Sequence, residues 1–279
     1  MLSYQHAYHA GIFADVVKHV TLSRILHYLS QKDKPILYLE THAGRGLYDL
    51  HSPEAMKTGE ATQGILQVLQ HQDTLPDVFL PYLEAIRACN PDGNLRYYPG
   101  SPMFDLHQLR TQDRLYCCEL HPQEVEALQR IKHQHPHMKM HVSHADFVKQ
   151  LSALLPPPER RALVFIDPSY EIKTDYQRIP EAVSQAYRRF HEGVYCIWYP
   201  MLNQKRHIQM CAEFDNISEK SLRIEFHLNE LATVGMTGCG LWVINPPYVL
   251  ATELDEVLSV LVPLLNIGHS SYELVLGCP

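Results

Sequence analysis

The sequence predicts an α/β fold built on an open, mostly parallel, Rossmann-like sheet. Short apolar runs typical of buried parallel strands alternate with segments of helical periodicity along the 279 residues. Several of these runs end at a glycine turn or an acidic residue, and such sheets bind ligands beside the carboxyl ends of their strands. We expect seven strands, the last of them antiparallel, together with an inserted small helical subdomain and an N-terminal helical arm.

The composition is that of an ordinary globular protein, with 46% hydrophobic and 20% charged residues. No apolar run is long enough to span a bilayer and the N-terminus lacks the plan of a signal peptide, so we expect a cytoplasmic protein with no membrane partner. The seven cysteines are odd in number and include no Cys-x-x-Cys, which favours reduced thiols. A net charge of −7 disfavours coating of nucleic acid by the whole surface but leaves room for a local basic face.

Residues 1–30 are expected to form an N-terminal arm and a helix. Apolar residues at helical spacing predict the helix over residues 12–29, with Asp15, Lys18 and His19 within one turn of each other. The first eleven residues contain two tyrosines and two histidines but no lysine or arginine. Such an aromatic arm either meets a partner or packs on the body of the protein, and the residues leave both hypotheses open.

The first strand, residues 36–40, runs into a glycine turn that contains Gly44. A turn of this kind lets the backbone approach a nucleotide-like ligand closely. It has neither the Gly-x-Gly-x-x-Gly pattern nor the Gly-Lys-Ser/Thr of a P-loop, which counts against NAD and ATP and favours a cofactor without a pyrophosphate. Residues 48–94 are helical in pattern and too long for a simple strand-to-helix connection. We interpret them as an inserted helical subdomain within a main domain of residues 31–47 and 95–279.

The second and third strands are each followed by an acidic residue. The second strand ends at Glu119, which is placed to accept hydrogen bonds from a ribose diol. The third strand, residues 138–142, is followed by a turn that contains Asp146. That carboxylate would hold an adenine amino group if a nucleoside lay across the strand ends.

The fourth strand, residues 162–167, ends at Asp167 and is followed by Pro168-Ser169-Tyr170. Proline cannot continue a strand ladder, so the carboxylate of Asp167 is presented at the end of the strand. The carboxylate and the proline carbonyl are two acceptors for an exocyclic amino group, and the tyrosine ring is a face on which a planar base can stack.

The remaining strands are expected at residues 193–198, 222–228 and 241–245. Asn245-Pro-Pro-Tyr248 follows the last of them and matches an amine-binding motif better than Asp-Pro-Ser-Tyr does. Because the last strand is expected to be antiparallel, its C-terminal end lies at the edge away from the cofactor, and we interpret the tetrapeptide as a structural turn. The histidine-rich stretch 133–144 lacks structural-zinc spacing, so we expect no metal site.

With these elements in sequence, the chain resembles the RlmJ family of bacterial 23S ribosomal RNA adenine-N6 methyltransferases, which have the class I methyltransferase fold. The resemblance covers essentially the whole chain, including the helical insertion. The matching segments are 3–6, Gly11, 14–16 with Lys18 and His19, 37–46, 96–102, 119–122, 166–176, 198–200, 235–238 and 244–247.

The resemblance implies S-adenosyl-L-methionine as cofactor and an adenosine of 23S ribosomal RNA, free or partly assembled, as substrate, with no obligatory protein partner. The residues implied to bind the cofactor are Lys18, His19, His42, Gly44, Ser101, Glu119, Asp146 and Asp167. The implied catalytic residues are Asp167, Pro168 and Tyr170. The residues implied to meet the substrate are Tyr4, His6, Lys18 and Tyr170.

Two positions depart from the family pattern, and two alternatives stay open. Glu40 stands where the family tends to have Asp, and Ser169 replaces the second proline of Asp-Pro-Pro-Tyr, which bears on rate more than on reaction type. A DNA adenine-N6 methyltransferase uses the same chemistry, although the insertion here is smaller than its usual recognition domain. A nucleic-acid-binding factor that retains the fold, with a role in the use of external DNA, is the other alternative.

Overall fold

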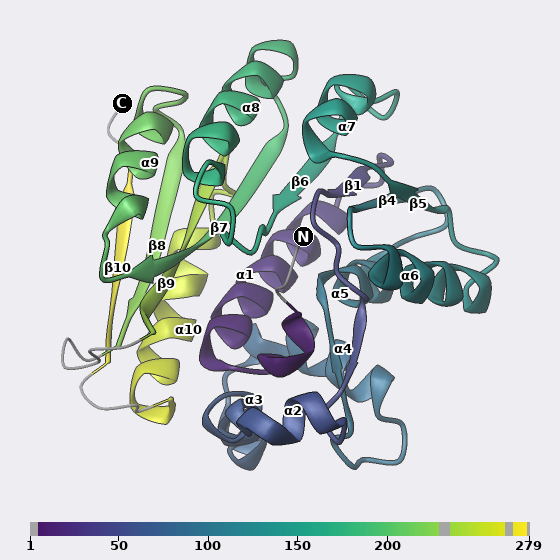
Figure 1. Ribbon diagram of the computed structural model, residues 1–279, viewed down its shortest axis with the longest axis vertical. Coiled ribbons are helices and arrows are strands. Elements are labelled where there is room, and N and C mark those ends of the chain that lie inside the picture. Colours follow the sequence, from purple (N-terminus) through teal and green to yellow (C-terminus); the bar gives the residue numbers. More distant parts are fainter. Residues whose placement is uncertain (1–4, 229–234, 266–269, 278–279) are drawn as a thin grey trace.

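The computed structural model describes residues 5–228, 235–265 and 270–277, and these residues form an eight-stranded sheet with helices on both faces (Figure 1). The parallel strands are β1 (Leu37–Glu40), β4 (Arg114–Glu119), β5 (Met140–His144), β6 (Ala162–Ile166) and β7 (Val194–Leu202). They lie in the order β5, β4, β1, β6, β7. Next to β7 come β9 (Met236–Ile244), β8 (Ser221–His227) and β10 (Ser271–Leu276), each antiparallel to its neighbour.

The predicted fold class is confirmed, and the described sheet has one strand more than predicted. β9 is the antiparallel strand that was expected to be the last. β10 follows it and pairs with β8 at the edge of the sheet. Its residues alternate between exposed and half-buried, so this strand lacks the apolar run that predicted the others.

Two hydrophobic cores hold the helices on the two faces of the sheet. Alternate side chains of a strand point to opposite faces, and accordingly Tyr38 enters the first core while Leu37 and Leu39 enter the second. The first core is covered by α1 (Phe13–Ser30), α4 (Leu80–Cys89), α5 (Ser101–Gln108), α6 (Pro122–Gln134) and α10 (Leu250–Leu264). The second is covered by α7 (Phe147–Leu154), α8 (Asp175–Arg189) and α9 (Arg206–Asp215).

Helix α1 is buried on nearly every side. It packs against α4, α5 and α10, and in Figure 1 it lies near the centre of the molecule. Its buried residues include polar ones, among them Asp15, Lys18 and His19. Because buried charges are rarely tolerated without partners, these three side chains must find them inside the protein.

Segment 48–94 is largely helical, as predicted. It contains α2 (Pro53–Thr58), α3 (Ile65–Gln70) and α4, with 3-10 turns between them, and its two ends meet in a small sheet of β2 (Leu47–Asp49) and β3 (Tyr97–Pro99). The N-terminal arm docks on it, because the Ile65 amide donates to the Gly11 carbonyl at 2.8 Å. A Cβ on Gly64 would lie 2.0 Å from that carbonyl oxygen, so this approach requires glycine.

The described part of the arm packs on the body of the protein. It contains a 3-10 turn, His6–Tyr8, in which Ala7 is buried, and Ala10 is buried just beyond it. The predicted helix over 12–29 is observed as Phe13–Ser30. Tyr4, which was predicted to meet the substrate, lies outside the described residues.

Two further findings concern the described residues as a whole. None of their helices has the length and apolar character needed to cross a bilayer. The six cysteines among them are all free, and five of these six are buried, in agreement with the prediction of reduced core thiols.

Candidate functional site

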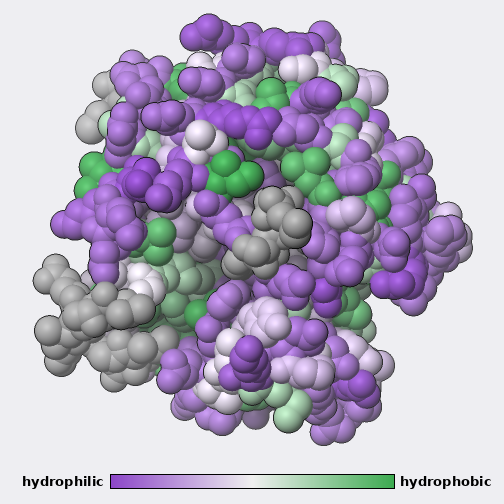
Figure 2. Space-filling view, viewed as in Figure 1, coloured by the Kyte–Doolittle hydropathy of each residue, from purple (hydrophilic) through white to green (hydrophobic). Residues whose placement is uncertain are grey.

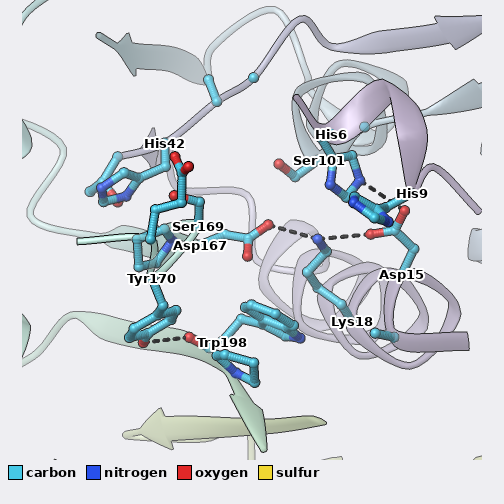
Figure 3. Close-up of a pocket in the computed structure, with 18 of the residues that line it drawn as sticks. His6, His9, Asp15, Lys18, His42, Ser101, Asp167, Ser169, Tyr170 and Trp198 are labelled. Atoms are coloured by element: carbon cyan, nitrogen blue, oxygen red, sulfur yellow. Dashed lines mark hydrogen bonds and ion pairs between the residues drawn. The ribbon is translucent and has the colours of Figure 1, made fainter. Parts of the chain in front are cut away.

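A cavity of about 340 Å³ opens at the carboxyl ends of the parallel strands. Such a volume falls within the range of small-molecule sites, about 300–1,000 Å³. Its floor comes from the turns after β1, β4 and β6 and from the end of β7, and one wall comes from the N-terminal arm and α1. Figure 3 shows labelled side chains from the arm, from α1, from the turns after β1 and β6, and from β7 around one space.

The glycine turn and Glu119 form one rigid part of this cavity. Gly44 has a φ of 59°, and its amide donates to Glu119 Oε2 at 2.8 Å. The other carboxylate oxygen accepts from the amides of Leu120 and His121 at 2.7 and 2.8 Å. A Cβ at Gly44 would lie 2.5 Å from the hydroxyl of Tyr48, so the turn requires glycine. Three backbone donors thus fix a carboxylate where we expect a pair of ligand hydroxyls.

Asp167 extends from the end of β6 toward α1. Its Oδ2 accepts a hydrogen bond from Lys18 Nζ at 2.7 Å (Figure 3). Pro168 and Ser169 follow it in the cavity wall. The structure therefore brings the predicted catalytic carboxylate to the same cavity as the glycine turn, although the two lie more than a hundred residues apart in sequence.

Tyr170 is held firmly beside Asp167. Its φ is 54°, a left-handed conformation that costs a non-glycine residue about 1–3 kcal/mol. Its hydroxyl donates to the Trp198 carbonyl at 2.8 Å, and its ring centroid lies 4.6 Å from that of Tyr176. These contacts hold the ring, which is 6% exposed, in the second hydrophobic core beside the cavity that Tyr170 helps to line.

Lys18 is held between two carboxylates. Besides its bond to Asp167, Nζ lies 2.9 Å from Asp15 Oδ1. The other oxygen of Asp15 accepts from His6 Nε2 and from the Gly11 amide, both at 2.9 Å. Burial opposes both charges, but the two carboxylates raise the pKa of Lys18 overall, while His6 and Lys18 hold the pKa of Asp15 well below its usual range. A series of polar contacts, from His6 through Asp15 and Lys18, therefore connects the N-terminal arm to Asp167.

The two predicted histidines are kept neutral. Burial lowers the pKa of His42 to about 4 and lowers the pKa of His19 well below its usual value. The hydroxyl of Thr41 donates to a carbonyl of β6, so Nδ1 of neutral His42 donates to that hydroxyl at 2.8 Å and its Nε2 is left as an acceptor. His19 pairs with the Tyr98 hydroxyl at 2.9 Å. Neutral imidazoles add no positive charge to the cavity, which suits a cationic ligand.

A buried carboxyl pair lies behind Ser101. The Ser101 hydroxyl donates to Glu40 Oε2 at 3.0 Å, and Glu40 interacts with Asp105 on α5. Both acids are almost completely buried, and burial raises the pKa of Glu40 well above its usual value and that of Asp105 to about 7. The pair therefore retains a proton at neutral pH. Asp105 was not predicted, because no motif marks its position in the helix.

Asp146 is placed differently from the other predicted cofactor residues. Its Oδ1 accepts from the Val148 amide and caps α7, and its Oδ2 pairs with Arg178 at 2.6 Å. Phe147 and Arg178, rather than Asp146 itself, line the cavity. The predicted contact between Asp146 and an adenine amino group stays a prediction.

Asn245 lies at the opposite edge of the sheet, as predicted for the end of an antiparallel strand. Its amide donates to the carbonyls of His191 and Gly193 at 2.7 and 2.8 Å. Gly193 immediately precedes β7, so Asn245 is at the amino end of that strand, whereas the cavity lies at its carboxyl end. The Asn-Pro-Pro-Tyr sequence is a structural turn here.

One group of possible metal ligands occurs in the part of the chain that the structure describes. It consists of Glu225, His227 and Glu273 on β8 and β10. None of these lines the cavity, and the histidine-rich stretch 133–144 contributes to no such group among the described residues.

Comparisons with known proteins show which proteins this chain resembles over most of its length. The family model described as ribosomal RNA large subunit methyltransferase D, RlmJ, matches residues 33–275. The ribosomal RNA large subunit methyltransferase J of Escherichia coli (strain K12) is 43% identical over 277 residues, which are 97% of this chain and 98% of that protein. The protein of the same name from Haemophilus influenzae is 41% identical over 269 residues, covering 95% and 94% of the two chains. A crystal structure of a protein from Legionella pneumophila superimposes with a TM-score of 0.91 at 51% identity, covering 96% of this chain and 98% of that one.

Proposed function

This chain belongs to the RlmJ family of ribosomal RNA large subunit methyltransferases, and we infer that it methylates the N6 amino group of an adenosine in 23S ribosomal RNA. The methyl donor is S-adenosyl-L-methionine. The observation that carries this function is the presence of Asp167, the glycine turn and the braced Glu119 in one cavity. The target RNA is proposed to be free or partly assembled, since its base must be reached outside a stack.

The residues present fit this cofactor. Glu119, fixed by three backbone amides, would accept from the ribose hydroxyls, and Ser101 would meet the polar end of the methionine moiety. His19 and His42 are neutral and do not repel a sulfonium. S-adenosylmethionine, when bound, supplies a methyl group activated by a positively charged sulfur.

Asp167 and Pro168 would orient the target nitrogen. The lone pair of an adenine N6 is spread into the ring, so the nitrogen is a poor nucleophile. Lys18 holds Asp167 Oδ2, and among the described residues no donor is recorded for Oδ1. Oδ1 and the Pro168 carbonyl would accept the two amino hydrogens, which aims the lone pair at the methyl group. After transfer, the carboxylate would accept the proton that the nitrogen releases.

Tyr170 is proposed to stack on the target base. Stacking on an aromatic side chain contributes about 1–3 kcal/mol per base in single-strand binders. Lys18 and His6 would shape the side of the pocket that faces the RNA, and Tyr4 would extend it from the arm. In a duplex the target base would have to be flipped out, which is easiest in a loop or bulge.

Replacement of the catalytic carboxylate tests this function. Asp167→Asn keeps the size of the side chain but removes the charge that pairs with Lys18 and accepts the proton. We expect methyl transfer to deproteinised 23S ribosomal RNA to fall at least about 100-fold, with cofactor affinity, measured by calorimetry, changed only a few-fold. Asp73→Asn, at an exposed position far from the cavity, is the matched control.

The opposite pattern would overturn the assignment of Asp167. In that pattern the variant loses cofactor binding but transfers methyl groups normally per bound cofactor. The same radiolabel assay with DNA as acceptor tests the alternative substrate, because label in DNA but not in RNA would identify a DNA methyltransferase.

A further inference from the structure

A groove of about 540 Å³ runs between α8 and α9, and it shares no lining residue with the catalytic cavity. Figure 1 shows the two helices on the same face of the sheet, and they pack against each other. The segment after Tyr170 separates the two spaces. Ile172 and Asp175 line the cavity, whereas Lys173 and Tyr176 line the groove. A strand of nucleic acid that leaves the cavity would therefore pass over this segment into the groove.

Charges are distributed unevenly along the groove. α8 follows β6 and α9 follows β7, and because these strands are parallel, both helices begin at the edge of the sheet where the cavity lies. Lys173 and Arg206 precede or begin the helices and so lie at the near end of the groove. Glu181 and Glu213 come in the middle, and Arg188 lies at the far end. Figure 2 shows the surface over these helices as mostly hydrophilic.

Within the described residues, Lys173 and Arg206 at the near end of the groove have no recorded carboxylate partner. Arg24, Arg45, Arg110 and Arg114 all form ion pairs with carboxylates. Lys173 and Arg206 are exposed, and neither occurs in any ion pair or hydrogen bond recorded between side chains of the described residues. Arg206 and Tyr176 both line the near end of the groove, and the positive charge of Arg206 opposes the rise in the pKa of Tyr176 that burial causes. In a chain of net charge −7, two such cations beside the cavity indicate an anionic ligand.

We propose that Lys173 and Arg206 bind the backbone phosphates of the RNA strand that flanks the target adenosine. This proposal rests on the proposed function. With the target base in the cavity, a flanking strand that passes over the segment after Tyr170 brings its phosphates to the near end of the groove, where these two side chains lie. Lysine and arginine are the usual phosphate ligands, and such contacts position a strand without reading its sequence. Glu181 and Glu213 repel phosphate, so the track is short and ends before Arg188.

The experiment measures binding of a labelled single-stranded RNA by fluorescence anisotropy at several salt concentrations, together with methyl transfer to 23S ribosomal RNA. Lys173→Ala and Arg206→Ala should each weaken RNA binding by up to about fivefold. Each should also reduce the slope of log Kd against log salt by about 0.7, the value for one single-strand phosphate contact. KM for RNA should rise with kcat little changed, and cofactor affinity should be unaltered.

Arg188→Ala is the matched control, because it removes an exposed arginine from the far end of the same groove. Lys173→Arg should retain binding, which separates loss of charge from damage to the fold. Equal binding and equal salt slopes for wild type, Lys173→Ala and Arg206→Ala would overturn the phosphate track, as would an effect of Arg188→Ala of the same size.

The two inferences fail separately. If the wild type binds RNA with the expected dependence on Lys173 and Arg206 but methylates no 23S ribosomal RNA, the proposed function fails and the track stands. If the wild type methylates the RNA and the variants bind and react like it, the track fails and the function stands.

Discussion

At the scale of single residues, Asp15 has the most consequential position among the residues for which no role was predicted. It is 1% exposed, and its two oxygens accept from Lys18, His6 and the Gly11 amide. It therefore positions the lysine that holds Asp167. Asp15 is a positioning residue, since it reaches the reacting atoms only through Lys18.

Asp15→Asn should lower both activity and stability. Leaving the buried Lys18 short of one charge partner costs about 3 kcal/mol of unfolding free energy at neutral pH. Because the pKa of Asp15 is lowered in the folded protein, its stabilisation is complete above the usual carboxyl range and is lost as the pH falls through the lowered value. Urea unfolding at several pH values should thus show the gap between variant and wild type shrinking in acid. A variant as stable as wild type at pH 7 would contradict this account.

Single residues differ in how far the sequence alone can predict them. Glu119 and Asp167 follow apolar strands directly, so their place at the ligand edge follows from topology. Asp15 and Lys18 stand one turn apart, and that spacing is visible, but the partner of Lys18 is 149 residues away. Only tertiary structure brings that pair together.

At the scale of elements, the contact between β1 and α5 contains an unusual pair of acids. Glu40 Oε1 and Asp105 Oδ1 are buried, and among the described residues neither oxygen has a recorded donor apart from the carboxyl group of the other acid. The raised pKa of Asp105, about 7, means that the folded protein retains a proton that the unfolded chain has released. Stability therefore falls as the pH rises from the usual carboxyl range through that value.

Asp105→Asn should weaken this dependence, leaving the part that comes from the raised pKa of Glu40. The amide is neutral at every pH and can donate to Glu40, so the variant should gain about 1–3 kcal/mol over wild type at pH 8 and little at pH 5. Thermal unfolding at both pH values measures the gain, with Asp73→Asn as the exposed control. A gain that is the same at both pH values would show that the acids do not share a proton.

Elements were predicted well where one physical signal dominates. The buried parallel strands read as apolar runs, and α1 was predicted to within one residue at each end. β10 was missed because its residues are exposed or only half-buried at the edge of the sheet, and such a strand has no buried apolar run. β7 and β9 are longer than predicted, since their extensions pair with each other beyond the central sheet.

At the scale of the whole molecule, the N-terminal arm, segment 48–94 and the catalytic cavity are mechanically joined. Gly64 lies against the Gly11 carbonyl, and the amide of Gly11 in turn donates to Asp15. A displacement of segment 48–94 should therefore shift Gly11 and Asp15 and, through them, the position of the Lys18 side chain.

Gly64→Ala tests that connection. A Cβ 2.0 Å from the Gly11 oxygen forces the two segments apart, which should cost about 1–3 kcal/mol of stability and lower kcat. Gly59→Ala is the comparison. A Cβ at Gly59 would meet no neighbouring atom, so the only cost of that substitution is the strain of a positive φ in a residue other than glycine. Calorimetric melting and single-turnover methyl transfer should both show the larger loss for Gly64→Ala. Equal turnover in the two variants would show that the position of segment 48–94 does not affect the catalytic site.

The global topology also explains which motif is functional. Two tetrapeptides, Asp-Pro-Ser-Tyr and Asn-Pro-Pro-Tyr, have similar chemistry, and the direction of the strand before each decides their edge of the sheet. This could be predicted from the order of strands. The docking of the arm could not be predicted, because it depends on the close approach of Gly11 and Gly64, and no local sequence pattern indicates that contact.

The burial of α1 on nearly every side has a consequence for how the enzyme can move. Amide protons in such a helix exchange with deuterium only when the entire domain opens, so its exchange should be among the slowest in the chain. Lys18 consequently stands on the most persistent element of the molecule. When a nucleotide binds, we therefore expect α1 to keep its conformation and the RNA to change its own.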